Sequence, residues 1–101
     1  MKYSREEIIF FLSMHSIAKR KLTYLNLQQE KYRKEIIFYE FIWEHAERWI
    51  SELELDEKEI IIKRFDEKKT FDQIAIEIGY ANHSSTIRKY TQIIEKIRRT
   101  Q

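Results

Sequence analysis

The side chains best suited to binding chemistry gather near the C-terminus of the chain. They are hydroxyl, amide, imidazole and cationic groups at spacings that a helix would place largely on one side. The set comprises His83, Ser84, Ser85, Arg88, Lys89, Gln92 and Lys96. Cations and neutral hydrogen-bond donors on one helix face suit a polyanion with readable edges, so the expected ligand is double-stranded DNA. Arg88 and Lys89 are the expected base-edge or adjacent phosphate contacts, because arginine can donate two hydrogen bonds to guanine.

A short helix and a tight turn precede this face. Thr70 and Gln73 have the spacing of a capping box, which predicts a helix over 71–78. Gly79 is the only glycine, and it stands where a helix that ends in a left-handed residue needs one. Asn82 is a suitable N-cap for a second helix over 83–99.

An apolar stripe should pack that second helix against the rest of its region. Ile87, Tyr90, Ile94 and Ile97 recur at spacings of three and four. Upstream, Asp56 and Glu59 predict the start of another helix, about 57–66, with Leu55 packed on Ile60. The sequence therefore predicts a trihelical helix-turn-helix region over 54–101.

A second group of polar residues lies just before the helix over 71–78. Helix N-termini attract anions because their first N–H groups have no partner within the helix. The candidate phosphate anchors here are Lys68, Lys69 and Thr70.

The residues Ile74, Ala75, Ile78, Gly79 and Tyr80 fit the general helix-turn-helix pattern. With LDEKEIIIKRF upstream and IIEKIRR at the end, the stretch from Leu55 to Arg99 resembles region 4 of bacterial sigma factors. It also resembles the small phage and mobile-element regulators of the RinA/ArpU type. The resemblance implies promoter-proximal DNA binding, regulation of transcription and RNA polymerase as a partner.

The first half of the chain is predicted to be a helical interaction region over 1–53. Ser4 and Glu7 form a capping box at its start. From Ile8 onward, apolar residues alternate at spacings of three and four, and no strong helix breaker interrupts them. One long continuous helix is expected, with a helical hairpin folded near Thr23–Gln28 as the alternative.

The second part of this apolar seam should form a homodimer interface. Ile37, Phe38, Phe41, Ile42 and Trp49 widen it beyond a two-stranded seam, so it must be covered by the first helix, by the C-terminal region or by a second subunit. The expected interface residues are Tyr32, Ile36, Tyr39, Trp43, Ala46, Ile50 and Leu53.

Composition narrows the class of protein further. The chain has 101 residues, a net charge of +2, one glycine, and neither proline nor cysteine, which favours an all-α fold. The sequence offers no disulfide framework, metal-ligand set, phosphate loop or catalytic triad, so neither an enzyme nor a cofactor is expected. No segment has the length or pattern of a membrane span or signal peptide, so a cytoplasmic location is expected. Two alternatives remain: a DNA-packaging or recombination accessory protein of a phage, and a helical protein-interaction adaptor.

Overall fold

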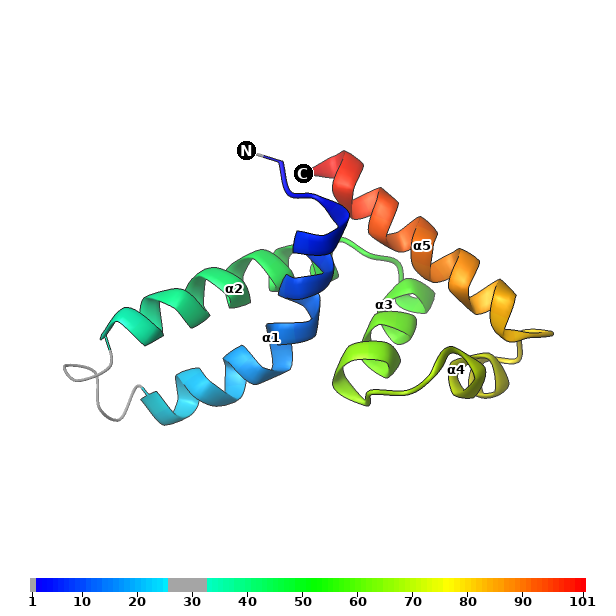
Figure 1. The fold of residues 1–101 in the computed structure, drawn as a ribbon, viewed down its shortest axis with the longest axis horizontal. Helices are drawn as coiled ribbons and strands as arrows, with labels where there is room; N and C mark the ends of the chain where they lie inside the picture. Colours follow the sequence, from blue (N-terminus) through cyan, green and yellow to red (C-terminus); the bar gives the residue numbers. More distant parts are fainter. Residues whose placement is uncertain (1, 26–32) are drawn as a thin grey trace.

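The computed structural model describes residues 2–25 and 33–101, and the regular structure in these ranges is entirely helical. Figure 1 shows the arrangement. In chain order the elements are α1 (Arg5–Leu25), α2 (Arg33–Ser51), α3 (Leu55–Ile61), the π-helical segment η2 (Ile62–Asp66), α4 (Phe71–Ile78) and α5 (His83–Thr100). The all-α prediction is confirmed. In the described ranges, no helix is long and apolar enough to cross a membrane.

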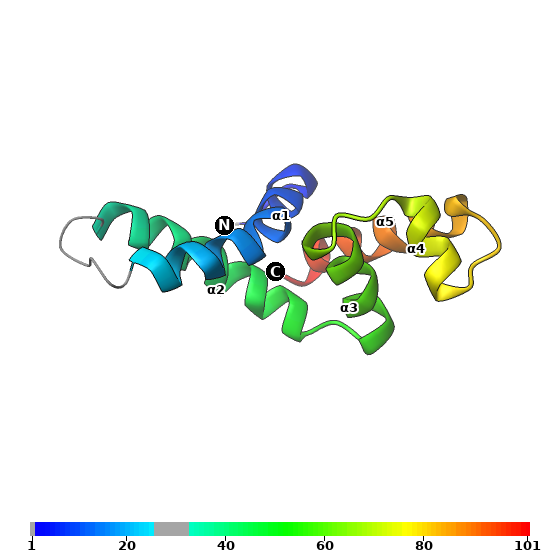
Figure 2. The same cartoon turned by 90° about the horizontal axis from the view of Figure 1, so that it is seen from below.

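The N-terminal half is a helical hairpin, not one continuous helix. The helices α1 and α2 run side by side in opposite directions, as Figures 1 and 2 show. The long-helix prediction is therefore wrong, and its hairpin alternative holds. An apolar seam that repeats along the chain can be covered by its own second half, since closing a short loop costs little entropy. Thr23 still belongs to α1, and the rest of the predicted reversal lies mostly outside the described residues.

The predicted start of α1 is confirmed by its hydrogen bonds. The Ser4 N–H donates to Glu7 Oε1 at 2.9 Å, and the Glu7 N–H donates to Ser4 Oγ at 3.2 Å. Each residue thus satisfies an N–H group that the helix itself leaves without a partner.

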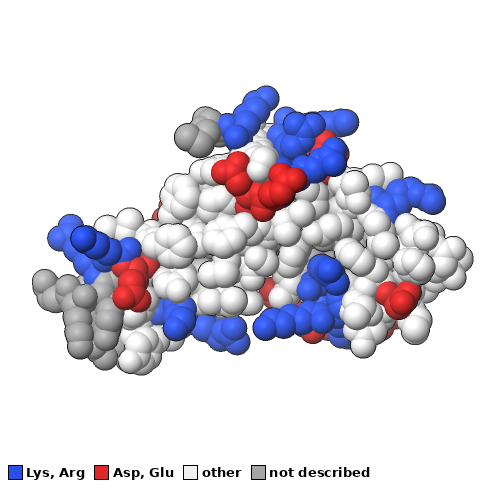
Figure 3. Space-filling model, viewed as in Figure 1, with Lys and Arg blue, Asp and Glu red and all other residues white. Residues whose placement is uncertain are grey.

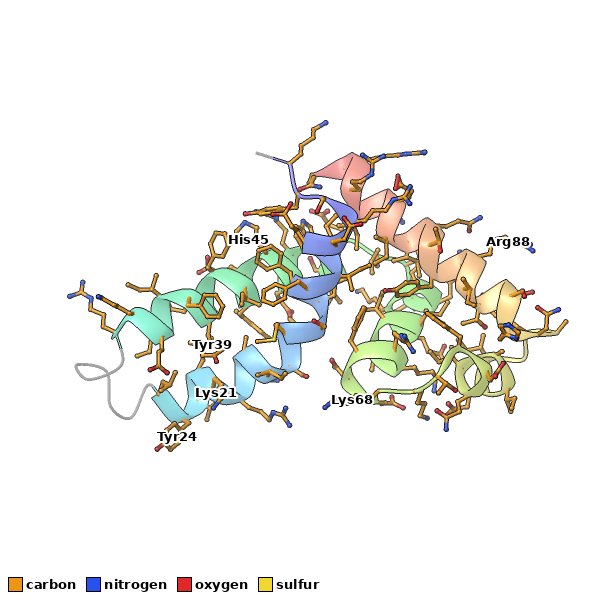
Figure 4. The ribbon with its side chains drawn as sticks, viewed as in Figure 1. Lys21, Tyr24, Tyr39, His45, Lys68 and Arg88 are labelled. Atoms are coloured by element: carbon orange, nitrogen blue, oxygen red, sulfur yellow. The ribbon has the colours of Figure 1, made fainter. Side chains whose placement is uncertain are left out.

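The residues of the predicted dimer seam pack within this one chain. Ala46 and Leu53 belong to the buried core, and Ile36 is also buried. The seam residues that pack half-buried against the core are Tyr39, Trp43 and Ile50, while Tyr32 lies outside the described residues. Figure 4 shows Tyr39 between α2 and α1. In this structure the seam is therefore used inside the chain.

One core joins the two predicted regions. Ile8 and Leu12 of α1 lie in the same buried cluster as Ile60 of α3 and Ile93 of α5. The two ends of the chain also meet, since Gln101 accepts a hydrogen bond from the Tyr3 N–H and donates one to the Tyr3 carbonyl. The hairpin consequently supports α5 directly.

Candidate nucleic-acid interface

The helix α4 begins and ends as its sequence predicts. The Gln73 N–H donates to Thr70 Oγ1 at 3.2 Å, and the Thr70 N–H donates to Gln73 Oε1 at 2.9 Å. Ile74 and Ala75 are buried. At the other end, Gly79 has φ +92° and its N–H donates to the Ala75 carbonyl. A Cβ on Gly79 would meet nothing within 4 Å, so the glycine is needed for its backbone conformation.

Aromatic contacts hold α4 against α5. The ring of Phe71 lies 5.1 Å from the ring of Tyr90, edge to face. The guanidinium of Arg64 lies over the ring of Phe71, 4.1 Å from the ring centre, and donates a hydrogen bond to the Lys69 carbonyl. Burial raises the pKa of the Tyr90 phenol. These contacts fix the direction in which α5 leaves the turn.

The helix α5 starts at the predicted cap but is rotated relative to the predicted stripe. The Ser85 N–H donates to Asn82 Oδ1 at 3.1 Å, which confirms Asn82 as the N-cap. Thr86 is fully buried, whereas Ile87 is 38% exposed, so the placement of Ile87 in the core was wrong. The three buried isoleucines, Ile93, Ile94 and Ile97, set the rotation of the helix. Seven residues span nearly two turns, so Thr86 lies within about 20° of Ile93 while Ile87 lies about 120° away.

The outward face of α5 is polar and has Arg88 near its middle. Arg88 lies about 140° from Ile93 at 100° per residue, and it is exposed. It makes no ion pair with any described residue of the chain, and Figure 4 shows it pointing away from the body of the protein. The exposed residues on and beside this face are Ser84, Ile87, Arg88, Thr91, Gln92, Arg98 and Arg99. The sequence prediction did not place Ile87 and Thr91 on this face. If the helix had been oriented with Ile93 and Ile97 inward, both residues would have been predicted to be exposed.

Two of the predicted contacts, Lys89 and Lys96, turn toward α3 instead. The Nζ atom of Lys96 lies 2.8 Å from Glu57 Oε1, and that of Lys89 lies 3.7 Å from Asp56 Oδ2. Burial alone would raise the pKa of Glu57, but hydrogen bonds from Lys96 and from the Glu54 N–H outweigh it and lower the pKa. The hydrogen bond to Glu57 raises the pKa of Lys96 in turn. Both lysines therefore bind α3 to the flank of α5.

The same carboxylate explains why α3 begins earlier than predicted. The Glu54 N–H donates to Glu57 Oε1 at 2.9 Å, so the helix is capped by Glu54 and Glu57 rather than by Asp56 and Glu59. Leu55 is 84% exposed and does not form the predicted apolar contact. Glu57 is favoured because one carboxylate serves both the cap and Lys96.

The predicted phosphate anchors do not form one surface with Arg88. Lys69 pairs with Glu67 and Glu77, and the Thr70 hydroxyl caps α4. Lys68 is exposed in a left-handed backbone conformation, φ 55°. In Figure 4, Lys68 and Arg88 lie on different sides of the C-terminal region. Of the remaining candidates, Ser84 and Gln92 lie on the outward face beside Arg88. Ser85 is half-buried and its N–H is bound to the cap residue Asn82, whereas His83 Nδ1 lies 3.2 Å from Asp72 Oδ1.

The charge of the outward face is partly neutralised at its C-terminal end. Glu95 pairs with Arg98 at 2.7 Å and with Arg5 of α1 at 2.8 Å. The hydrogen bonds from Arg98 and then from Arg5 lower the pKa of Glu95 to about 2. Arg88 in the first half of α5 and Arg99 near its end are consequently the cations of this face that form no ion pair with a described residue.

Comparison of the chain with protein-family models, with curated proteins and with solved structures found no match. The described residues contain no group of three histidine or acidic side chains arranged to hold a metal ion.

Proposed function

We propose that this protein binds double-stranded DNA and regulates transcription, with α4, the Gly79 turn and α5 acting as a helix-turn-helix. The observation that carries the proposal is the outward face of α5. The apolar residues of α5 other than Ile87 are turned into the core, while Arg88, which forms no ion pair with a described residue, stands among hydroxyl and amide side chains. A helix with this distribution is suited to the major groove, where phosphates flank hydrogen-bonding base edges.

Each residue of this face has a distinct proposed role. Arg88 donates to a guanine edge or to a phosphate. Ser84 and Gln92, close to it along the helix, add hydrogen bonds to bases or phosphates. Ile87, exposed beside them, is suited to an apolar contact such as a thymine methyl group.

We further propose that the protein is a cytoplasmic, dimeric regulator of phage or mobile-element type, and that it acts with RNA polymerase. This proposal is supported by the resemblance of 55–99 to sigma region 4 and by the positive-φ turn at Gly79. A phage DNA-packaging or recombination accessory protein is the main alternative. A reporter assay with RNA polymerase separates the two, because only a regulator changes the amount of transcript.

The adaptor alternative draws support from one exposed residue of α4. Ile76 is 80% exposed on the outer side of that helix. Tight binding to a protein partner without affinity for DNA would favour the adaptor over the regulator.

The direct test is a fluorescence-anisotropy titration with a duplex selected from random DNA and with a scrambled duplex. If Arg88 contacts a base, Arg88→Ala should cost about 1–3 kcal/mol on the selected duplex and relax preference at one position. If it contacts a phosphate, binding to both duplexes should weaken alike. Arg20→Ala is the matched control, because it removes the same charge from an exposed position on α1.

Lys89→Ala and Lys96→Ala should instead act mainly through stability, since both lysines pair with α3. The proposed interface would be refuted if the affinity for DNA changed neither with Arg88→Ala nor with the salt concentration.

A further inference from the structure

The helix α2 has an apolar outer face that the described chain covers only in part, at His45, which stacks on Phe11 and contacts Tyr3. Ile37, Phe38 and Phe41 are 57%, 48% and 45% exposed. The ring of Phe41 lies 5.6 Å from that of Phe11, which continues the aromatic surface onto α1. Figure 3 shows a broad uncharged area over α1 and α2. Exposed apolar surface of this kind is uncommon on monomers and marks an interaction site.

The charges on this face have an order along the helix. Positions 34, 38, 41, 45, 48 and 52 fall within a band of about 40° to either side of the first, at 100° per residue. The band holds three Lys, Arg or Glu residues: Lys34 stands at its N-terminal end, and Arg48 and Glu52 stand toward the other end, where Glu52 directly follows α2. Lys34 and Glu52 are exposed, and neither forms an ion pair within the described chain. We define the outer face of α2 as this band together with Ile37.

This order makes the face complementary to itself in one orientation. When two copies of α2 pack antiparallel, Lys34 of each lies opposite Glu52 of the other, and Arg48 of each lies opposite the uncharged Phe38. In a parallel pair Lys34 would face Lys34, which is unfavourable. An interface of this kind is isologous, with the same surface used by both subunits.

We propose that the outer face of α2 binds the outer face of a second copy of this chain, with the two helices antiparallel. Lys34 of each copy faces Glu52 of the other, Phe38 lies under Arg48, and Phe41 lies beside His45. The positions from 34 to 52 span about 27 Å, so a crossing angle near 20° keeps them in contact throughout. The cation over an aromatic ring and the two end ion pairs fix the register.

The inference provides the dimer that the proposed function includes, through a surface other than the predicted seam. It does not depend on DNA binding, because the mass of the protein is measured without DNA. A failure of DNA binding therefore leaves it intact, and a monomer that binds DNA contradicts this inference alone.

The test is sedimentation equilibrium of the full chain, with loading concentrations from about 1 μM to about 1 mM to cover weak and moderate affinities. The wild type should be a dimer at the upper end. Lys34→Glu and Glu52→Lys should each raise the dimer Kd by about tenfold or more, because each places like charges together at both ends of the interface. The double variant Lys34→Glu/Glu52→Lys should restore the Kd to within about threefold of the wild type, since the pairs are re-formed in reverse.

Two further variants complete the design. Phe41→Asp should raise the Kd by about a hundredfold or more, because it places a carboxylate in the apolar centre. Lys21→Glu, which makes the same charge change at an exposed position on α1, should leave the Kd unchanged. Circular dichroism on every variant verifies that the monomer stays folded.

A wild type that is monomeric throughout the range would overturn the inference. A dimer whose Kd is unchanged by the two charge reversals would also overturn the inference. In that case Trp43→Ala would test whether the predicted seam forms the dimer. If both single reversals weaken the dimer and the double variant does not recover, the antiparallel register is contradicted, and Lys34 and Glu52 do not face each other across the interface.

Discussion

The outer faces of α2 and α5 differ although their inner faces are alike. Both helices bury apolar residues, Ile42 and Trp49 in α2 and Ile93 and Ile97 in α5, within one shared core. Outward, α2 presents aromatic rings between opposite charges, whereas α5 presents Arg88 among hydroxyl and amide groups. The inner face of a helix thus fixes how it packs, and the outer face indicates what it binds: protein for α2 and a polyanion for α5 under our two proposals.

The largest expected effect separates the inner from the outer face of α2. Trp49 is 2% exposed, so Trp49→Ala should lower the free energy of unfolding by about 3–5 kcal/mol, through lost burial and the cavity left behind. Phe38→Ala, measured below the concentration at which dimers form, should cost less than about 1 kcal/mol because half of that side chain is already exposed. Urea unfolding of both variants measures the difference. Equal losses would mean that the two faces of α2 are not distinct.

The salt concentration should affect the two proposed affinities differently, that of α5 for DNA and that of α2 for a second copy of the chain. With two or three phosphate contacts, DNA affinity should fall by roughly 10- to 40-fold between about 50 and about 200 mM salt. The proposed dimer should change much less, because most of its contact area is apolar and salt screens only its end pairs. Anisotropy and sedimentation in matched buffers give both dependences. Similar slopes for the two would contradict the contrast drawn between the faces.

The turn before α5 offers a smaller effect that is specific to the C-terminal region. Gly79→Val should cost about 1–2 kcal/mol or more, since a β-branched residue fits poorly at φ +92°. Gly79→Asn, which tolerates the left-handed region better, should cost less. Thermal melts of the full chain compare the two variants. Equal midpoints for glycine and valine would show that the turn does not depend on the left-handed conformation.

The smallest effect concerns the neutralised end of the α5 face. Glu95 has a pKa of about 2 in the folded protein, below its ordinary 4.5, so its contribution to stability is fully present above about pH 4.5. That contribution is lost as the pH falls toward 2, where the folded protein also binds the proton. A carbon NMR titration of the Glu95 carboxyl group should show this pKa directly. Arg98→Ala should raise it more than Arg5→Ala, because the hydrogen bond from Arg98 is the larger cause; the reverse order would contradict the assignment.

Local signals in the sequence were enough to place the starts of α1, α4 and α5 and the end of α4. The caps at Ser4, Thr70 and Asn82 and the left-handed Gly79 depend on a residue and its near neighbours alone. The same holds for the all-α class, which follows from helical periodicity with one glycine and no proline. These features are determined within a few residues of chain, so no tertiary information was needed to predict them.

The tertiary structure decided the features that depend on contacts between residues far apart in the chain. The periodicity of the N-terminal half fits a continuous helix and a hairpin equally well, and the packing of α1 on α2 selects the hairpin. Thr86 and Ile87 both continue a spacing of three or four back from Tyr90, and only the burial of Ile93 and Ile97 places Thr86 inside. Lys89 and Lys96 resemble Arg88 in sequence, but the carboxylates of Asp56 and Glu57 meet them across about thirty to forty residues of chain. A charge pattern along one helix cannot show which of its cations another helix will neutralise, because that depends on how the helices pack.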